Sequence, residues 1–444
     1  MKALRYLLLL CVSLLLALSL ISCGDSGDGD GEALPSDVKT LNVYNWGEYI
    51  SDGSFDSLDT NAAFEEYFNE NLSKKYGFKI KVLYSTYATN EDMYSKITSG
   101  AGTYDVIIPS DYMIEKLKNE GWLYEYDVTE LENYKYIRDS FKSLYYDQNN
   151  RYSVPYTYGM VGVIYNTALV DEEDYSEKSW NLMWNEKYRG KILQFNNQRD
   201  AFGSAMYYTG LDINSKDKAV WERALAKLKE QKPLLQGYVN DEIFNKMTTA
   251  SAAIAPYFAG DFLIMADQNE DLDFFYPKEG TNYFVDAMCI PKNANLPEVA
   301  KEYINFMLSE EVAVANATYI GYASPNKLVY DDDYINEEYA EEMGEYALEI
   351  LYGASPEEAN AEYLKLYETP CYKSFDQDTQ NYVNQLWESL KTENSTELWV
   401  HLASAAIVVA VLVLAGYTTY TRKKRSHDYR LRDKMAKLAK KQKQ

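Results

Sequence analysis

Strand-like and helix-like segments alternate three times between residues 40 and 119, and this alternation limits the fold more than any other feature of the sequence. Helical spacing of apolar residues follows each strand-like segment. Because parallel strands need a crossover connection, strands that alternate with helices form a wound, parallel sheet. The sequence therefore predicts an α/β fold, with strands at 40–44, 78–84 and 104–109 and helices at 61–75, 90–98 and 111–119.

Two later runs are richer in strand-forming residues. They span 152–165 (YSVPYTYGMVGVIY) and 284–291 (FVDAMCIP). We interpret them as crossings between two α/β lobes, which places a cleft between the lobes. Lobe 1 is expected at 39–156 with 286–326, and lobe 2 at 157–285 with 327–394. Further strands are predicted at 191–195 and 252–257, and further helices at 216–230, 298–308, 310–317, 330–366 and 381–391.

The N-terminal segment has the features of a secretory signal. A positively charged start precedes an apolar run at 7–20. The sequence Leu-Ile-Ser-Cys that ends at Cys23 resembles the lipobox of bacterial lipoproteins, in which the cysteine thiol takes a diacylglycerol group. Residues 23–38 are rich in Gly, Asp and Ser and are predicted to be a flexible tether. We therefore expect 1–22 to be a signal peptide and Cys23 to be lipidated.

A second apolar segment lies near the C-terminus. Residues 398–421 contain no Asp, Glu, Lys or Arg and are long enough to cross a bilayer as a helix. The basic cluster at 422–425 follows at once, so the positive-inside rule places the tail, 422–444, in the cytoplasm. Since a single acyl chain binds a membrane weakly, this transmembrane helix would make the attachment permanent. We expect a protein of the cell membrane whose main domain is extracytoplasmic.

The extracytoplasmic part is strongly acidic. Residues 23–400 hold 31 basic and 66 acidic residues, a net charge of −35. This excess argues against nucleic acid and anionic lipid as ligands, because both are polyanions. The excess suits a cationic ligand, or it simply keeps the domain soluble.

Histidine is missing from this part of the sequence. Both histidines, His401 and His427, lie within or after the segment 398–421. This excludes Ser-His-Asp and Cys-His catalysis and histidine-ligated zinc in the main domain. We expect no enzyme activity, no metal and no cofactor. Cys289 and Cys371 are the cysteines that remain after Cys23, and whether they pair stays open.

Candidate binding residues follow from the predicted strand ends. In open α/β sheets, ligands bind at the carboxyl ends of the strands. Each of five such loops combines aromatic or amide side chains with a carboxylate, as a cation requires, and none has a glycine-rich phosphate cradle. The loops hold Trp46, Glu48 and Tyr49; Ser110, Asp111 and Tyr112; Asn197 and Asp200; Tyr257 and Asp261; and Phe284 and Asp286. Asp111 and Asp261 are also candidates for helix caps.

At these loops the chain resembles the periplasmic spermidine/putrescine-binding proteins, the receptors of bacterial polyamine uptake. The similar segments run in order through nearly all of 39–394. They include VYNWGEYI (43–50), YDVIIPSDYMIEKLKNEGWL (104–123), YPKEGTNYFVDAMCIPKNA (276–294) and IGYASPN (320–326). The resemblance implies the two-lobed fold of periplasmic binding proteins, which closes over its ligand. It also implies delivery of the ligand to the permease of an ABC transporter, and we expect the receptor to act as a monomer.

Carried over by position, the resemblance implies eleven ligand-binding residues. Ten come from the strand-end loops, and Tyr322 is added as a ligand-facing tyrosine. Where the family has a hydroxyl residue, this chain has Gly47; where it has a carboxylate, Asn197; and where it has tryptophans, Tyr257 and Phe284. These departures leave the choice between putrescine and spermidine open. The alternative function is the same fold with another small cation or metabolite as ligand.

Overall fold

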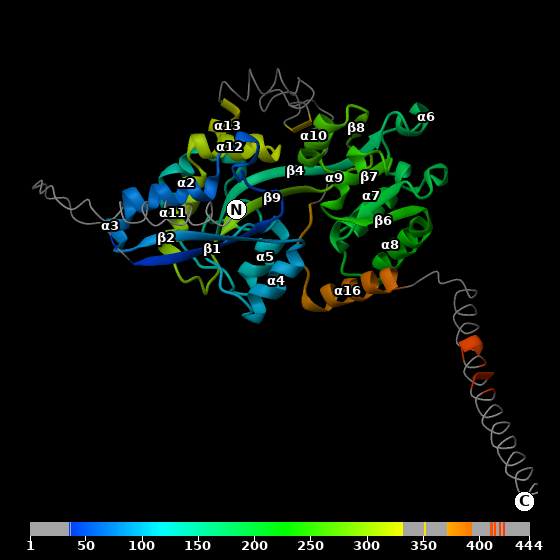
Figure 1. Ribbon diagram of the computed structural model, residues 1–444, viewed down its shortest axis with the longest axis horizontal. Coiled ribbons are helices and arrows are strands. Elements are labelled where there is room, and N and C mark those ends of the chain that lie inside the picture. The colour runs from blue at the N-terminus through cyan, green and yellow to red at the C-terminus, as the bar shows by residue number, and fades with distance from the viewer. Residues whose placement is uncertain are drawn as a thin grey trace, which may run out of the picture.

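Two long strands connect the two ends of the molecule in the computed structural model (Figure 1). The structure describes residues 35, 37–331, 350–351 and 371–392, together with 409–411, 413, 417–418 and 421. The strands are β1 (Val38–Trp46), β2 (Lys79–Tyr87), β3 (Val106–Ile107), β4 (Ser153–Asn166), β5 (Ile192–Phe195), β6 (Leu235–Val239), β7 (Ile254–Phe258), β8 (Leu272–Phe275) and β9 (Tyr283–Cys289).

The described strands form one sheet in the order β2-β1-β3-β9-β4-β7-β5-β6, and β8 pairs with β4 outside this path. The pairs β1–β2 and β1–β3 are parallel at one end of the sheet, and β5–β6 and β5–β7 are parallel at the other. The central strands β4 and β9 are antiparallel to each other. The predicted parallel arrangement is therefore confirmed within each end but not at the centre.

The central strand β4 changes its partner along its length. Its first part, Ser153 to Met160, pairs with β9, and the next part, Val161 to Tyr165, pairs with β7. Only Gly159 of its residues is not fully buried, which explains why the sequence is a nearly continuous apolar and aromatic run. The predicted crossings at 152–165 and 284–291 correspond to β4 and β9.

Helices cover both ends of the sheet. We call the part around β1, β2 and β3 the first half, and the part around β5, β6, β7 and β8 the second half. The first half carries α2 (Thr60–Tyr67), α3 (Ser73–Tyr76), α4 (Asn90–Ser99), α5 (Asp111–Asn119), α11 (Pro297–Met307), α12 (Glu310–Ile320) and α13 (Lys327–Asp331). The second half carries α6 (Glu172–Tyr175), α7 (Gln198–Thr209), α8 (Lys218–Gln231), α9 (Glu242–Thr248), α10 (Ala259–Gln268) and α16 (Gln377–Thr392).

Several predicted helix boundaries are confirmed. Gly77 ends α3 with a φ of 77°, and Gly100 ends α4 in the same left-handed conformation. The predicted helix at 61–75 is divided, because a π turn (Phe68–Leu72) separates α2 from α3. The sequence did not reveal α6, α7, α9, α10, β6 or β8.

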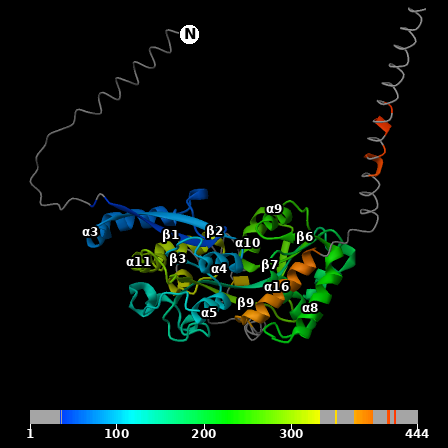
Figure 2. The same cartoon turned by 90° about the horizontal axis from the view of Figure 1, so that it is seen from below.

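The C-terminal helix α16 packs against α8 in the second half, and Figure 2 shows the two side by side. A short extended segment, 371–376, precedes it. Cys371 in this segment and Cys289 in β9 are both free thiols, so the structure contains no bridge between them.

Five predicted segments lie wholly or largely outside the described residues. They are 1–22, 23–38 up to residue 34, the acidic stretch 330–366, the span 398–421 and the tail 422–444. Among the residues that the structure does describe, no helix has both the length and the apolar character needed to cross a bilayer.

Candidate functional site

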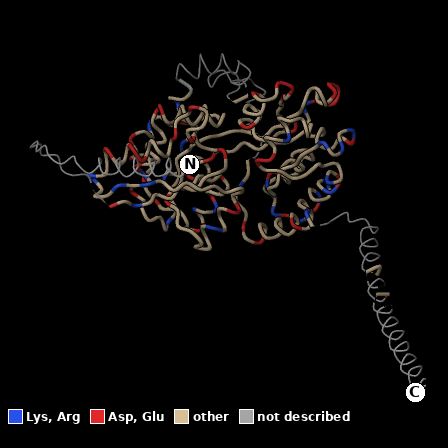
Figure 3. Tube along the Cα trace, in the orientation of Figure 1, with Lys and Arg blue, Asp and Glu red and all other residues tan. Residues whose placement is uncertain are grey.

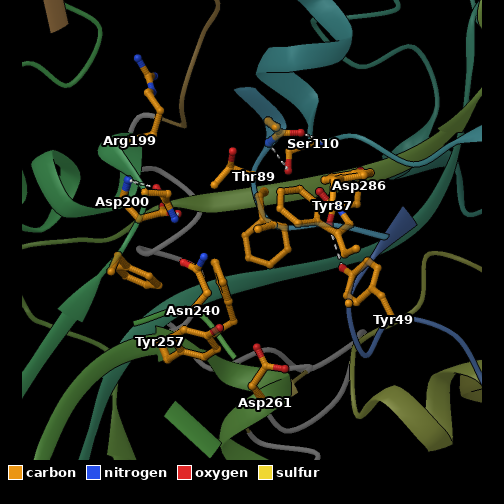
Figure 4. Close-up of a pocket in the computed structure, with 18 of the residues that line it drawn as sticks. Tyr49, Tyr87, Thr89, Ser110, Arg199, Asp200, Asn240, Tyr257, Asp261 and Asp286 are labelled. Atoms are coloured by element: carbon orange, nitrogen blue, oxygen red, sulfur yellow. Dashed lines mark hydrogen bonds between the residues drawn. The ribbon is translucent and has the colours of Figure 1, made fainter. Parts of the chain in front are cut away.

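A cleft of about 970 Å³, measured out to its open mouth, lies between the two halves. All eleven residues expected from the sequence line it: Trp46, Glu48, Tyr49, Ser110, Tyr112, Asn197, Asp200, Tyr257, Phe284, Asp286 and Tyr322. They come from the ends of β1, β3, β5 and β7, from the start of β9 and from the turn after α12. Figure 4 shows that several of their side chains point toward a common space. Whether each one binds a ligand remains a prediction.

The first half contributes the turn after β1. The Trp46 indole N–H donates to the Ile108 carbonyl at 2.9 Å, which fixes the ring across the end of β3. The Asn45 side chain donates to the Tyr49 carbonyl at 3.2 Å and closes the turn. Glu48 lies at the tip with a φ of 48° and is exposed at the rim of the cleft.

Asp286 lies on β9 between the halves. It is only 4 % exposed, and its Oδ2 accepts a hydrogen bond of 2.7 Å from the Tyr49 hydroxyl. Its Oδ1 is buried and accepts no hydrogen bond from any described residue. Burial, the largest effect, and the charge of Asp200 together raise the pKa of Asp286 to about 6, against the lowering effect of the Ser110 and Tyr49 hydroxyls. A buried carboxylate oxygen without a donor calls for a cationic or donor group from a ligand.

Asp200 marks one end of the cleft. Asn197 is the N-cap of α7: its Oδ1 accepts from the Asp200 backbone N–H at 2.9 Å, and its Nδ2 donates to Asp200 Oδ2 at 2.8 Å. Asn197 therefore caps the helix and also holds the carboxylate. Burial raises the pKa of Asp200 to about 6, against the lowering effect of the Asn197 hydrogen bond.

Asp261 marks the other end. It lies in the first turn of α10, and the Tyr322 hydroxyl donates to its Oδ2 at 2.8 Å. Burial, the largest effect, and the charges of Asp241 and Glu48 together raise the pKa of Asp261 to about 7, against the lowering effect of the Tyr322 hydrogen bond. The Tyr322 ring lies edge-on to Tyr49, with the ring centroids 5.1 Å apart. Asp261 thus lies at the site as well as in a helix start.

Aromatic rings form the remaining walls. In the second half, Phe195 stacks on Tyr257 with centroids 5.4 Å apart, and Phe258 meets Phe284 edge-on at 5.4 Å. These rings give methylene groups an apolar surface, and their faces attract cations. Tyr257 and Phe284 therefore keep the aromatic character of the positions even though neither is a tryptophan.

The charged groups that line the cleft are almost all negative. Seven carboxyl groups line the cleft, whereas Arg199 is the only lysine, arginine or histidine among the lining residues. Acidic segments also occur over both halves (Figure 3). The carboxyl groups are Glu48, Glu91, Asp111, Asp200, Asp241, Asp261 and Asp286. The described part of the chain has no group of three His, Cys, Asp or Glu side chains placed to hold a metal ion. The carboxyl groups and aromatic walls together favour an organic cation with an apolar body as the ligand.

Several lining residues were missed by sequence reasoning. Thr89, Asn90 and Glu91 follow β2, and the strand-end rule would have selected them had it been applied to that strand. Asn240 and Asp241 follow β6, a short strand that the sequence pattern did not reveal. Arg199 and Tyr372 also line the cleft. No sequence signal marks Tyr372, because it reaches the cleft from the far end of the chain.

Comparison with known proteins agrees with this architecture. A family model described as bacterial extracellular solute-binding protein matches residues 62–342. The spermidine/putrescine-binding periplasmic protein of Escherichia coli (strain K12) is 32% identical over 308 residues, which cover 69% of this chain and 83% of that protein. The putrescine/cadaverine-binding protein of Pseudomonas aeruginosa is 27% identical over 306 residues, covering 67% of this chain and 82% of that protein.

A solved structure from Listeria monocytogenes, described as a spermidine/putrescine ABC transporter, is 32% identical and has a TM-score of 0.66. The match covers 80% of this chain and 99% of that one. A spermidine/putrescine substrate-binding protein from Streptococcus pneumoniae is 30% identical with a TM-score of 0.58, over 80% of this chain and 98% of that one. The chain therefore belongs to the bacterial extracellular solute-binding proteins.

Proposed function

We propose that this protein is the receptor of a polyamine importer. It binds putrescine or spermidine outside the cytoplasm and delivers it to the permease subunits of an ABC transporter, without catalysing a reaction. The names of the Escherichia coli and Pseudomonas aeruginosa relatives support this ligand class. The seven carboxyl groups and the aromatic walls of the cleft support it independently.

The unpartnered Oδ1 of Asp286 is the observation that carries the proposal. A buried charge without a partner costs several kcal/mol, and an ammonium group that donates to this oxygen would remove the cost. The aromatic faces around it add about 0.5–2 kcal/mol for each cation contact. Asp200 and Asp261 line the same cleft and would pair the other ammonium groups. The remaining predicted residues, Trp46, Glu48, Tyr49, Ser110, Tyr112, Asn197, Tyr257, Phe284 and Tyr322, would form the walls and supply hydrogen bonds.

The two halves are proposed to act as lobes that close over the ligand, with lobe 1 at 39–156 and 286–326 and lobe 2 at 157–285 and 327–394. The passage of β4 and β9 between the halves supports the division. The helix α13 begins at Lys327, in the proposed lobe 2, but packs against α12 of the first half.

The receptor is also proposed to be a membrane-attached monomer with two anchors. One is a lipid on Cys23, and the other is a transmembrane helix at 398–421 that leaves the basic tail, 422–444, in the cytoplasm. The support for both anchors is the sequence pattern alone.

Calorimetric titration of the purified protein with putrescine, spermidine, spermine, lysine and thiamine tests the proposed ligand class. We expect saturable one-to-one binding of putrescine or spermidine. A folded sample that binds neither would contradict the proposal, and binding of lysine or thiamine instead would favour the alternative of another small cation or metabolite.

A further inference from the structure

The segment Cys371–Asp376, which we call the strap, contacts both halves of the molecule. Toward the first half, the Tyr145 hydroxyl donates to the Tyr372 carbonyl at 2.6 Å, and the Ser374 backbone N–H donates to Glu115 at 2.8 Å. Toward the second half, the Asn214 side chain donates to the Cys371 carbonyl at 2.8 Å and accepts from the Lys373 N–H at 2.9 Å. These contacts fix the strap between the halves.

The strap places Tyr372 in the cleft beside Asp200. Tyr372 is 4 % exposed, and its ring meets Tyr112 edge-on with centroids 6.1 Å apart. A Cβ atom on Gly203 would lie only 1.9 Å from the Tyr372 hydroxyl oxygen. The tyrosine therefore fits against α7 because residue 203 has no side chain. A hydrogen bond from Tyr372 also lowers the pKa of Asp200 against the effect of burial.

Arg199 lies behind Tyr372 and belongs to the wall rather than to the open space. Its guanidinium lies over the Tyr372 ring at 4.5 Å and over the Phe375 ring at 4.0 Å, and its Nη2 donates to the Lys373 carbonyl at 3.3 Å. The side chain is 3 % exposed. Figure 4 shows it pointing away from Asp286 and Tyr49.

The protein interior continues beyond this layer, since Phe375 packs edge-on against the buried Trp221 at 5.3 Å. Glu48 and Asp241 also line the cleft, and both are exposed, so the cleft opens to solvent at these two residues. The cleft therefore has one closed end, at Asp200, and one open rim, at Glu48 and Asp241.

We propose that Tyr372, held by Arg199, is a length-determining wall of the cleft. A polyamine inserts one primary ammonium at Asp200 and ends there, while its other end points toward the rim. This inference rests on the proposed function. The wall would allow the cleft to accept a polyamine with a substituent on one terminal nitrogen, because the unsubstituted end can face Asp200. A polyamine with substituents on both terminal nitrogens would be rejected, because either orientation forces a substituent against Tyr372. Arg199 serves as a positioning residue, since its stacking holds the Tyr372 ring.

Ligands of equal charge test this without any change to the protein. Putrescine, N-ethylputrescine and N,N′-diethylputrescine each carry two ammonium groups, and calorimetry with the full chain gives their affinities. We expect N-ethylputrescine to bind within about threefold of putrescine. We expect N,N′-diethylputrescine to bind about tenfold to a hundredfold more weakly, the range typical of overpacking a closed site.

Two tyrosine variants identify the wall. Tyr372→Ala vacates space at Asp200, and we expect it to bring the affinities of the doubly and singly substituted ligands to within about threefold of each other. Tyr322→Ala is the matched control, since Tyr322 is similarly buried, at 5 % exposed, and its hydroxyl bonds Asp261. It should weaken the binding of all three ligands and leave the order of their affinities unchanged.

Arg199→Gln should shift the pH dependence of putrescine affinity to higher pH, because the guanidinium lowers the pKa of Asp200.

Different outcomes separate this inference from the proposed function. Equal affinities of all three ligands for the wild-type protein would contradict the proposal of a closed end. The proposed function as a polyamine receptor would still stand. Restoration of diethyl binding by Tyr322→Ala but not by Tyr372→Ala would move the wall to the other end and overturn the assignment. Failure of a folded wild-type protein to bind putrescine or spermidine would overturn the proposed function and this inference together.

Discussion

Asp286 combines deep burial with incomplete hydrogen bonding. Its Oδ2 is bonded by Tyr49, whereas its Oδ1 has no described donor. A buried group in this state destabilises the ligand-free protein and strengthens the binding of a cation. At the scale of single residues, this side chain therefore defines the chemistry of the cleft.

We expect Asp286→Asn to weaken polyamine affinity at least about tenfold, equivalent to about 1.4 kcal/mol, because it removes the charge and keeps the shape. Calorimetry gives the affinity, and thermal unfolding checks the fold. Asp105→Asn is the control: Asp105 is also fully buried, but it bonds Asn42 and Leu296 outside the cleft. Unchanged affinity of Asp286→Asn would show that the site is misassigned.

The pKa values of the cleft predict a pH dependence of binding. Burial raises the pKa of Asp286 and of Asp200 to about 6, and that of Asp261 to about 7. An ammonium ligand prefers ionised carboxylates, so affinity should be high above pH 7 and fall as the pH drops through 7 and 6. Titrations between pH 5 and 8 measure this, and a flat profile would contradict the role of these groups.

The same groups predict how stability changes with pH. Carboxyl groups with raised pKa bind more protons in the folded state than in the unfolded state, so their contribution to folding falls as the pH rises from about 4 to 7. Ligand binding opposes this loss. The ligand-induced increase in Tm should therefore be larger at pH 7.5 than at pH 5.5, which differential scanning calorimetry can measure.

At the scale of elements, the start of α10 fits closely against the turn after α12. A Cβ on Gly260 would lie 2.4 Å from the Tyr322 ring and 2.8 Å from the Gly321 carbonyl oxygen. This close approach joins the second half to the first and holds Tyr322 in place for Asp261. It depends on a residue without a side chain, because a backbone carbonyl cannot yield as a flexible side chain can.

Gly260→Ala is therefore expected to displace Tyr322, lower the stability by about 1–3 kcal/mol and weaken polyamine binding at least about tenfold. Gly237→Ala in β6 is the control, because no atom lies within 4 Å of a Cβ at that position. Denaturant unfolding and calorimetry measure the two effects. Binding by Gly260→Ala at the wild-type affinity would show that Tyr322 does not need this contact.

At the scale of the whole molecule, the two proposed anchors make separate predictions. Cys23→Ala should abolish incorporation of a labelled fatty acid and still leave the protein in the membrane fraction, because the segment 398–421 would hold it. Truncation after residue 394 should leave it attached through the lipid alone. Only the combination of both changes should release it, so release of Cys23→Ala into the medium would contradict the spanning helix.

Much of the candidate site was predictable because it follows a local rule. Trp46, Ser110, Asn197 and Tyr257 lie at the last residues of strands or within three residues after them, and the carboxyl ends of parallel strands meet at one edge. Hydrophobic periodicity located β2 and most of the long helices, and runs of strand-forming residues located β1, β4 and β9. It failed for β6 and α7, because β6 is short and only partly buried and α7 is buried on nearly all sides, so neither shows a clear period.

The sequence by itself determined the α/β class, the two crossing strands, the acidic and aromatic character of the cleft, and the charged ends of the chain. These properties depend on short-range patterns and on composition. The tertiary structure alone decided that β4 and β9 run antiparallel, that Asp286 keeps one oxygen without a donor, and that Tyr372 lines the cleft together with Asp200. Each depends on contacts between residues far apart in the chain, and burial of a polar atom is known only once every neighbouring segment is in place.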